Sequence, residues 1–239
     1  MNATYFTLGN LPSKYSSQLK HIHLVNIVKH KAVKAEGYAA TFAPLVNELK
    51  QLFTDGFDVC VSDGHVEKFY AVLCTVSGDN LSSNGLAGFR QVFNSGRVCR
   101  MCMVVHSQLP DKLTEDDVML RNPTDHAYRV AAVKQNPDNA GIYGVTGPSV
   151  FSDLEYFETT NSFPPDIMHD CMEGVIPVLV TTIVKRLVSE KATTINECNN
   201  ALASFPFKGA DRTNRPEPLK ANGDIVSLFL AQQQAPDCC

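Results

Sequence analysis

The stretch Phe69-Tyr-Ala-Val-Leu-Cys-Thr-Val76, followed by Ser77-Gly-Asp-Asn80, decides the fold prediction for this chain of 239 residues. Its first part is almost entirely apolar, which is typical of a central strand that is covered on both faces. Asp79 follows the carboxyl end of that strand, where open α/β sheets place their ligand-binding groups. Asp79 could instead cap a helix over residues 81–93. The stretch therefore predicts an α/β fold with a carboxylate at a strand end.

Upstream of this strand the sequence predicts a hairpin and two helices. Residues 57–62 and 69–76 flank Asp63-Gly64, a turn dipeptide that is typical of β-hairpins. Apolar residues recur at helical spacing over residues 42–53, and Asp55-Gly56 ends that pattern. A weaker helical spacing over residues 13–33 predicts a further helix, after a short β-rich run at residues 4–8.

Downstream, residues 107–150 are polar and rich in proline and glycine, which predicts a long irregular insertion with one short helix over residues 116–121. A helix is expected from residue 166 to residue 187, and Pro177 should kink it or split it. A final helix is expected over residues 194–205.

Composition excludes some classes of protein. The hydrophobic share of 44% is enough for a buried core, whereas the net charge of −4 argues against a self-sufficient DNA-binding protein. No apolar run reaches the roughly 18–20 residues of a membrane helix, because Pro177, Lys185 and Arg186 interrupt the longest candidate. No secretory signal is seen at residues 1–10, so we expect an intracellular protein with reduced thiols and no membrane partner.

Two of the eight cysteines form a C-x-x-C pair, Cys99-Arg-Met-Cys102. Such a turn can supply two thiolates to a tetrahedral zinc ion, which needs two further ligands. The nearest histidines along the chain are His106, His126 and His169. A redox pair and unligated thiols are the alternatives. The scattered cysteines, Cys60, Cys74, Cys171 and Cys198, are expected to be buried structural thiols.

The second candidate site is Asp166-Ile-Met-His169-Asp170-Cys-Met-Glu173. On a helix, Asp166, His169, Asp170 and Glu173 share one face. Three carboxylates beside a histidine are tolerated around a cation, and also at an exposed helix start. The cluster is therefore either a positioned site or a solvated first turn with Asp166 as its N-cap.

Taken together, these motifs resemble transposase-derived proteins of the EnSpm/CACTA type. The resemblance is carried by Gly78-Asp-Asn-Leu81, Gly88-Phe89, the C-x-x-C pair and Pro165-Asp-Ile-Met-His-Asp-Cys-Met-Glu-Gly-Val175. Tyr5-Phe-Thr-Leu-Gly-Asn-Leu-Pro12 and Glu48-Leu-Lys-Gln-Leu52 are also similar to that family's core, so that the likeness extends over residues 4–230.

The resemblance implies an α/β, RNase H-like fold with an Asp, Asp, Glu/Asp active site that holds two Mg²⁺ ions. It makes Asp79 the second catalytic carboxylate and Asp166 a further catalytic candidate. Asp166 and His169 form the family's Asp-x-x-His signature, with a structural or metal-linked role. Cys99 and Cys102 become ligands of a structural Zn²⁺, with His106 and His169 as further candidates. DNA is the implied partner, and a nuclear location is expected.

The resemblance also predicts how the chain is organised. A partial RNase H-like core is expected over residues 1–95, a zinc-type insertion over 96–160, a helical continuation over 161–230 and a ragged tail over 231–239. The first and third catalytic carboxylates would lie before residue 4 and beyond residue 230. We therefore expect a fragment that is inactive by itself and that can self-associate through an open sheet edge.

Two other functions fit the same residues. The first alternative is a domesticated, non-catalytic zinc-binding protein that contacts nucleic acid or protein. The other is a zinc hydrolase that uses His169 with neighbouring carboxylates, which requires an open zinc site with three protein ligands.

Overall fold

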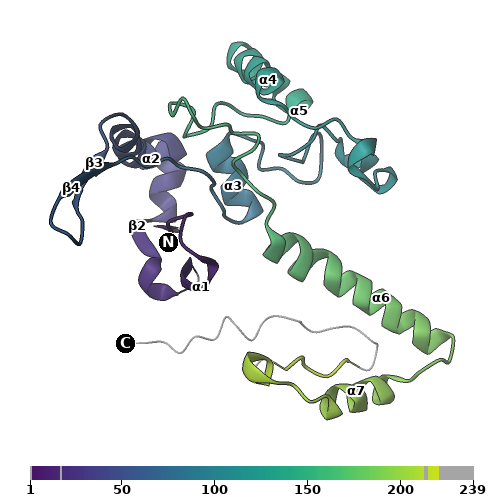
Figure 1. Ribbon diagram of the computed structural model, residues 1–239. Helices are drawn as coiled ribbons and strands as arrows, with labels where there is room; N and C mark the ends of the chain where they lie inside the picture. Colours follow the sequence, from purple (N-terminus) through teal and green to yellow (C-terminus); the bar gives the residue numbers. More distant parts are fainter. Residues whose placement is uncertain (1, 17, 213–214, 221–239) are drawn as a thin grey trace. The chain divides into compact units, whose positions relative to one another are not determined.

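The computed structural model describes residues 2–16, 18–212 and 215–220, and the chain divides into two compact units. Unit 1 comprises Met1–Pro164 and unit 2 comprises Pro165–Cys239. Within the described residues, the strands form two antiparallel two-stranded sheets, and helices make up most of the remaining regular structure (Figure 1).

Unit 1 begins with a hairpin in which β1 (Asn2–Phe6) pairs with β2 (His23–Val28). The connection holds α1 (Ser13–Ser16) and a 3₁₀ turn, η1 (Leu19–His21). The helix that we predicted over residues 13–33 is therefore wrong. Its apolar residues include the β-branched Val25, Ile27 and Val28, which suit a strand once β1 provides a hydrogen-bonding partner.

The next element, α2 (His30–Thr54), confirms the helix predicted over residues 42–53 and extends it towards the N-terminus. Gly37 interrupts α2 with a φ of 82°. Gly56, with a φ of 67°, follows the helix and turns the chain towards the next strand. Phe42 and Val46 are the buried residues of the second half of α2, which places this face of the helix against the core.

The second hairpin pairs β3 (Phe57–Cys60) with β4 (Val66–Phe69) around Gly64, whose φ is 89°. The hairpin at Asp63-Gly64 is thus confirmed, but the long buried strand over residues 69–76 is wrong. The strand ends at Phe69, and residues 70–79 have no regular secondary structure.

The backbone of residues 70–79 is hydrogen-bonded to scattered partners instead of a neighbouring strand. Ala71 N–H donates to Leu52 O, and Val76 N–H donates to Ser162 O. Leu73 N–H donates to the hydroxyl of Tyr156. An apolar sequence favours a strand only where another strand is available to pair with it.

The remainder of unit 1 is built around three helices: α3 (Asn80–Ala87), α4 (Pro123–Gln135) and α5 (Ala140–Tyr143). Three 3₁₀ turns lie between these helices: η2 (His106–Asp111), and the shorter η3 (Glu115–Asp117) and η4 (Pro137–Asn139). The prediction of an irregular stretch over residues 107–150 is wrong where α4 forms. The short helix expected over residues 116–121 is replaced by η3.

One hydrophobic core joins residues from both halves of unit 1. Phe42 of α2 meets Phe151 edge-on, with ring centroids 6.1 Å apart. Phe151 in turn contacts Phe157 at 5.3 Å, and Phe157 meets Phe163 at 5.8 Å. Ten buried side chains make up this core: Phe42, Val46, Ala87, Phe89, Val133, Val145, Phe151, Leu154, Phe157 and Phe163.

Unit 2 begins with a π-helical segment, η5 (Ile167–Val175), which continues as α6 (Ile176–Ser189). The predicted division near Pro177 is confirmed, and Pro177 occupies the first turn of α6, where its missing N–H has no cost. The predicted last helix is also confirmed as α7 (Ile195–Ser204), followed by the 3₁₀ turn η6 (Gly209–Arg212). The predicted tail over 231–239 lies outside the described residues.

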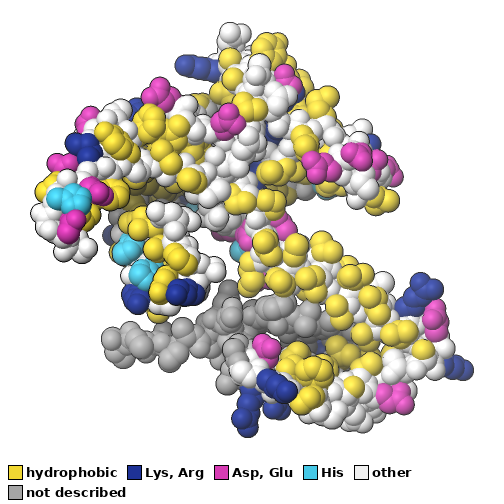
Figure 2. Space-filling view, in the orientation of Figure 1, with side chains coloured by type: hydrophobic (Ala, Val, Ile, Leu, Met, Phe, Trp, Pro, Cys, Tyr) yellow, Lys and Arg dark blue, Asp and Glu magenta, His cyan; other side chains and the backbone are white. Residues whose placement is uncertain are grey.

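The helical segment Ile167–Ser189 exposes much of its apolar surface, as the hydrophobic side chains along α6 in Figure 2 show. Among the described residues it is the one segment that is long and apolar enough to cross a membrane, with a mean hydropathy of 1.5. Length and composition are weak indications, because the core helices of water-soluble proteins meet the same criteria.

Candidate functional site

Asp79 caps the N-terminus of α3. Its Oδ1 accepts a hydrogen bond from Ser82 N–H at 2.6 Å, and the hydroxyl of Ser83 donates to Gly78 O at 3.0 Å. The N-cap interpretation is therefore confirmed. Because the Asp79 side chain is also exposed, it remains accessible to solvent and ions. Capping by one oxygen and cation binding by the other are compatible, so the catalytic role stays a prediction.

The other residues of this motif are structural. Asn84 is 1% exposed, and its side-chain amide donates to Arg90 O at 2.9 Å. Gly88 ends α3 in the left-handed conformation, with a φ of 73°. Its carbonyl oxygen accepts hydrogen bonds from the N–H and the hydroxyl of Thr146. These contacts join α3 to the segment that follows α5.

The C-x-x-C pair forms a tight turn. The Sγ atom of Cys99 accepts hydrogen bonds from the backbone N–H groups of Met101 and Cys102, with N···Sγ distances of 3.3 Å. The ends of this turn are held together by a bridge between Arg97 and Val105. Cys102 is 7% exposed, and burial is the main cause that raises its thiol pKa. Two thiols on one turn fit half of a tetrahedral zinc site, and a bound cation would favour their deprotonated form.

The remaining zinc ligands are not gathered in the structure. His106 is exposed, and its backbone N–H donates to Gly96 O at 2.8 Å. Within the described ranges, no three His, Cys, Asp or Glu side chains lie close enough together to hold a metal ion. The burial expected for the scattered cysteines is wrong, because Cys60, Cys74 and Cys171 are exposed and Cys198 is half-buried.

Arg100, inside the C-x-x-C turn, was not singled out from the sequence. It is 7% exposed, and its Nη1 donates to Oδ1 of Asn80 at 2.6 Å. Its Nε donates to Phe163 O at 3.2 Å, and its Nη2 donates to Pro164 O at 2.6 Å. The side chain thus joins the cysteine turn to the residue after Asp79 and to the segment that leads to Asp166. Partners 20, 63 and 64 residues away leave no local signal in the sequence.

Asp166 and His169 are brought together in unit 2. Nδ1 of His169 lies 2.5 Å from Oδ2 of Asp166, while Oδ1 of Asp166 accepts the N–H groups of Met168 and His169. Burial raises the pKa of Asp166, but the hydrogen bonds from His169 and Met168 outweigh it and leave the pKa lowered. The predicted N-cap is therefore confirmed.

The other carboxylates of the Asp166 cluster take different positions. Oδ2 of Asp170 accepts the backbone N–H of Asp166 at 3.2 Å. Glu173 lies farther from the histidine, with its Oε2 3.8 Å from Nε2 of His169. The face predicted from helical spacing thus brings the side chains of Asp166 and His169 into contact, although the segment is π-helical, and Asp170 contacts the backbone of Asp166.

Arg121 is a buried cation beside the cysteine turn. It is 5% exposed, and its Nε donates to Cys99 O while its Nη1 donates to Tyr143 O. Burial lowers its pKa to about 10. Its guanidinium lies 4.9 Å from the centre of the Phe89 ring.

The Phe89 ring also contacts the ring of His126, with the two ring centroids 5.1 Å apart. Burial, reinforced by the charges of Arg121 and Arg129, lowers the pKa of His126 to about 4, so this histidine is neutral at pH 7.

Comparisons with known proteins give a family but no individual relative. No curated protein and no solved structure matches the chain. A protein-family model described as "Plavaka transposase" matches residues 4–182. This range includes Asp79, the C-x-x-C turn and the Asp166–Glu173 cluster, and it covers more than half of the chain. The chain therefore belongs to the Plavaka transposase family, in agreement with the transposase ancestry predicted from its motifs.

Proposed function

We propose that this chain contributes to DNA strand cleavage and transfer by a DDE-type transposase with an RNase H-like core, of the EnSpm/CACTA type. Asp79 is one of its catalytic carboxylates, and Cys99 and Cys102 bind a structural Zn²⁺. Mg²⁺ held by such carboxylates would activate the attacking oxygen and stabilise the leaving oxygen of the phosphodiester. The same proposal places the protein in the nucleus with DNA as its partner.

The observation that supports this proposal is the position of Arg100. One guanidinium contacts Asn80, which directly follows Asp79, and the carbonyls of Phe163 and Pro164, which precede Asp166 in the chain. Arg100 itself lies between Cys99 and Cys102. A zinc ion on these thiols would restrict the turn and therefore the backbone from which Arg100 reaches its partners. In this way a structural metal would support the position of a catalytic carboxylate.

The zinc part of the proposal is tested by the metal content of the purified chain. We expect about one zinc per chain, and we expect its loss in both Cys99→Ser and Cys102→Ser. Cys60→Ser is the matched control, because Cys60 is exposed and lies outside the turn. Zinc that survives both substitutions, or a folded chain without zinc, would contradict the assignment.

The role of Asp79 can be separated from its capping role by two substitutions. Asn caps helices about as well as Asp, so Asp79→Asn should keep the hydrogen bond to Ser82 while removing the charge. Asp79→Ala removes both. With Mn²⁺ as a paramagnetic probe, we expect the NMR signals of the amides around Asp79 to broaden in the wild type. In Asp79→Asn these signals should stay sharp. Equal broadening in both proteins, or none in either, would refute the metal-binding role.

The zinc-hydrolase alternative has less support. It requires three protein ligands around one open zinc site, and His169 would be one of them. Nδ1 of His169 contacts Asp166, and the described part of the chain brings no three metal-binding side chains together. The alternative of a non-catalytic zinc-binding protein predicts bound zinc but no Mn²⁺ effect in the Asp79 experiment.

A further inference from the structure

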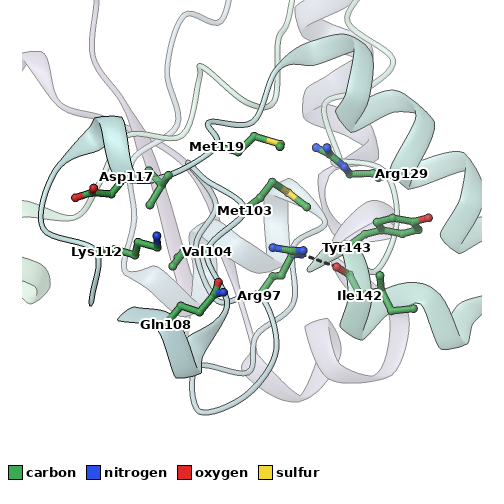
Figure 3. Close-up of a pocket in the computed structure, with 11 residues that line it drawn as sticks. Arg97, Met103, Val104, Gln108, Lys112, Asp117, Met119, Arg129, Ile142 and Tyr143 are labelled. Carbon is green, nitrogen blue, oxygen red and sulfur yellow. Dashed lines mark hydrogen bonds between the residues drawn. The ribbon is translucent and has the colours of Figure 1, made fainter. Parts of the chain in front are cut away.

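A cavity of about 410 Å³ opens in unit 1 beside the C-x-x-C turn. Figure 3 shows the cationic side chains of Arg97, Lys112 and Arg129 around it, together with Gln108. Met103, Met119 and Tyr143 supply apolar surface. The cavity thus combines three positive charges with a partly apolar wall.

Some hydrogen-bond donors at this cavity have no acceptor among the described residues. The Nε of Arg97 donates to Ile142 O at 2.7 Å, and no described residue accepts a hydrogen bond from its two terminal nitrogens. The side chain of Arg129 is 11% exposed, and its Nη2 pairs with Asp125 at 3.3 Å. Its Nη1 is buried without a partner among the described residues. A buried donor without an acceptor is destabilising, so a bound acceptor would be favoured.

A third guanidinium lies close to Arg97. A Cβ atom built on Gly144 would lie 2.7 Å from Nη2 of Arg121 and 2.9 Å from Cβ of Arg97, so both arginines closely approach this glycine. Nη2 of Arg121 is likewise buried and has no hydrogen-bond partner among the described residues. A buried guanidinium nitrogen without an acceptor therefore lies close to the backbone that carries Arg97.

The cavity's own carboxylate offsets the charge of Lys112 but is not directed at the two arginines. Asp117 is the acidic residue of its lining, and its carboxylate accepts hydrogen bonds from Leu113 N–H, Thr114 N–H and the Thr114 hydroxyl. In Figure 3 this carboxylate points away from Arg97 and Arg129. The surroundings of the cavity remain net positive even with Asp125, which pairs with Arg129, counted beside Asp117.

We propose that this cavity binds a phosphate group of a DNA backbone. Guanidinium groups bind phosphate oxygens with two parallel hydrogen bonds, and the exposed Lys112 adds a mobile positive charge. The apolar wall formed by Met103, Met119 and Tyr143 suits the adjoining sugar. That the phosphate belongs to DNA rests on the proposed function, whereas the anion site itself rests on the arginines.

The test compares two exposed lysines in the full-length chain. Lys112 lines the cavity, and Lys134 lies on the same helix as Arg129 but outside the cavity. Each is replaced by Gln, so both variants lose one charge without disturbing a buried group. Affinity for a short fluorescein-labelled DNA duplex is measured by anisotropy at several salt concentrations, with no divalent cation added.

We expect Lys112→Gln to weaken DNA binding about fivefold. Its affinity should also depend less steeply on salt, by the equivalent of about one phosphate contact. Lys134→Gln should change the affinity by less than about twofold. Arg129→Gln should weaken binding by about tenfold or more. Equal effects of Lys112→Gln and Lys134→Gln would refute the site, as would a wild-type chain that binds no DNA.

A second arm distinguishes DNA from free phosphate. Inorganic phosphate should compete with the DNA for the wild type and should lose this effect in Lys112→Gln. If phosphate raises the unfolding temperature of the wild type but DNA neither binds nor competes, the ligand is a small anion and the DNA assignment is wrong. The DNA titration contains no divalent cation, whereas the role of Asp79 is tested by Mn²⁺ broadening, so this proposal and the catalytic role of Asp79 can fail independently.

Discussion

The guanidinium of Arg100 and the side-chain amide of Asn80 are joined by a hydrogen bond of 2.6 Å between residues 20 positions apart. Asn80 is the first residue of α3, and the preceding residue is the capping Asp79. The start of this helix is therefore held both by its own cap and by an arginine from the cysteine turn. This contact links the zinc candidate to the catalytic candidate more directly than their spacing in the sequence indicates.

We predict that Arg100→Met destabilises unit 1 by about 2–4 kcal/mol, because it removes the guanidinium donors from one buried acceptor, Phe163 O, and from the partly buried acceptors of Asn80 and Pro164. Arg100→Lys should cost less, since an ammonium group can satisfy one or two of these acceptors. The free energy of unfolding in urea measures both effects. Lys34→Met, at an exposed position of α2, is the control and should change the stability by less than about 0.5 kcal/mol.

We predict that Gly88→Ala destabilises the protein by more than about 2 kcal/mol. The backbone of Gly88 has a φ of 73°, and an added Cβ would lie only 2.7 Å from Pro148 O, with Gly147 O closer still. Both backbone strain and a steric clash therefore act at this position. Gly147→Ala is the matched control, because nothing lies within 4 Å of its Cβ position. A thermal unfolding midpoint that is equal in the two variants would contradict this account.

Elements with local signals could be predicted from the sequence, and those with distant partners could not. Thr194 and Glu197 form a reciprocal capping box at the start of α7, where the helix was predicted. By contrast, the apolar run after Phe69 satisfies its backbone through residues such as Ser162, far along the chain. Periodicity and composition carry no information about such partners.

The same distinction applies to the candidate site. The spacing of Asp166 and His169 predicted their contact, because both lie on consecutive turns of one helix. The cavity formed by Arg97, Lys112 and Arg129 was not predictable, since its residues come from three separate segments, two of them in the stretch that was expected to be irregular. The cap at Asn122 and Pro123 was the local signal that could have identified α4 and hence Arg129.

We predict that stability falls as the pH decreases from 6.5 towards 4, with His126 as a main cause. Its pKa in the folded state is about 4, below the ordinary value of 6.5. Because the unfolded chain then binds the proton more readily, the contribution of neutral His126 is complete above pH 6.5 and is lost as the pH falls towards 4. Between pH 7 and pH 5 we expect a loss of about 1–2 kcal/mol.

Urea unfolding at the two pH values measures this loss. His126→Gln should lower the stability at pH 7 and should show a flatter pH dependence over the same range. His106→Gln is the control, because His106 is exposed. A pH dependence that His126→Gln leaves unchanged would assign the effect to other groups.

The last prediction separates a structural from a catalytic role of Asp166. Asp166→Ala removes the acceptor for Met168 N–H, His169 N–H and the His169 side chain, and should destabilise the start of this helix by about 1–2 kcal/mol. Asp166→Asn should retain most of the capping energy, because the Asn side chain accepts the same backbone hydrogen bonds. Amide hydrogen exchange of residues 168–171 measures the local effect of each variant. If Asp166→Asn preserves this protection and also any Mn²⁺ broadening at residues 168–171, the Asp-x-x-His pair acts through the helix start. If it preserves protection but abolishes that broadening, Asp166 itself binds the metal ion.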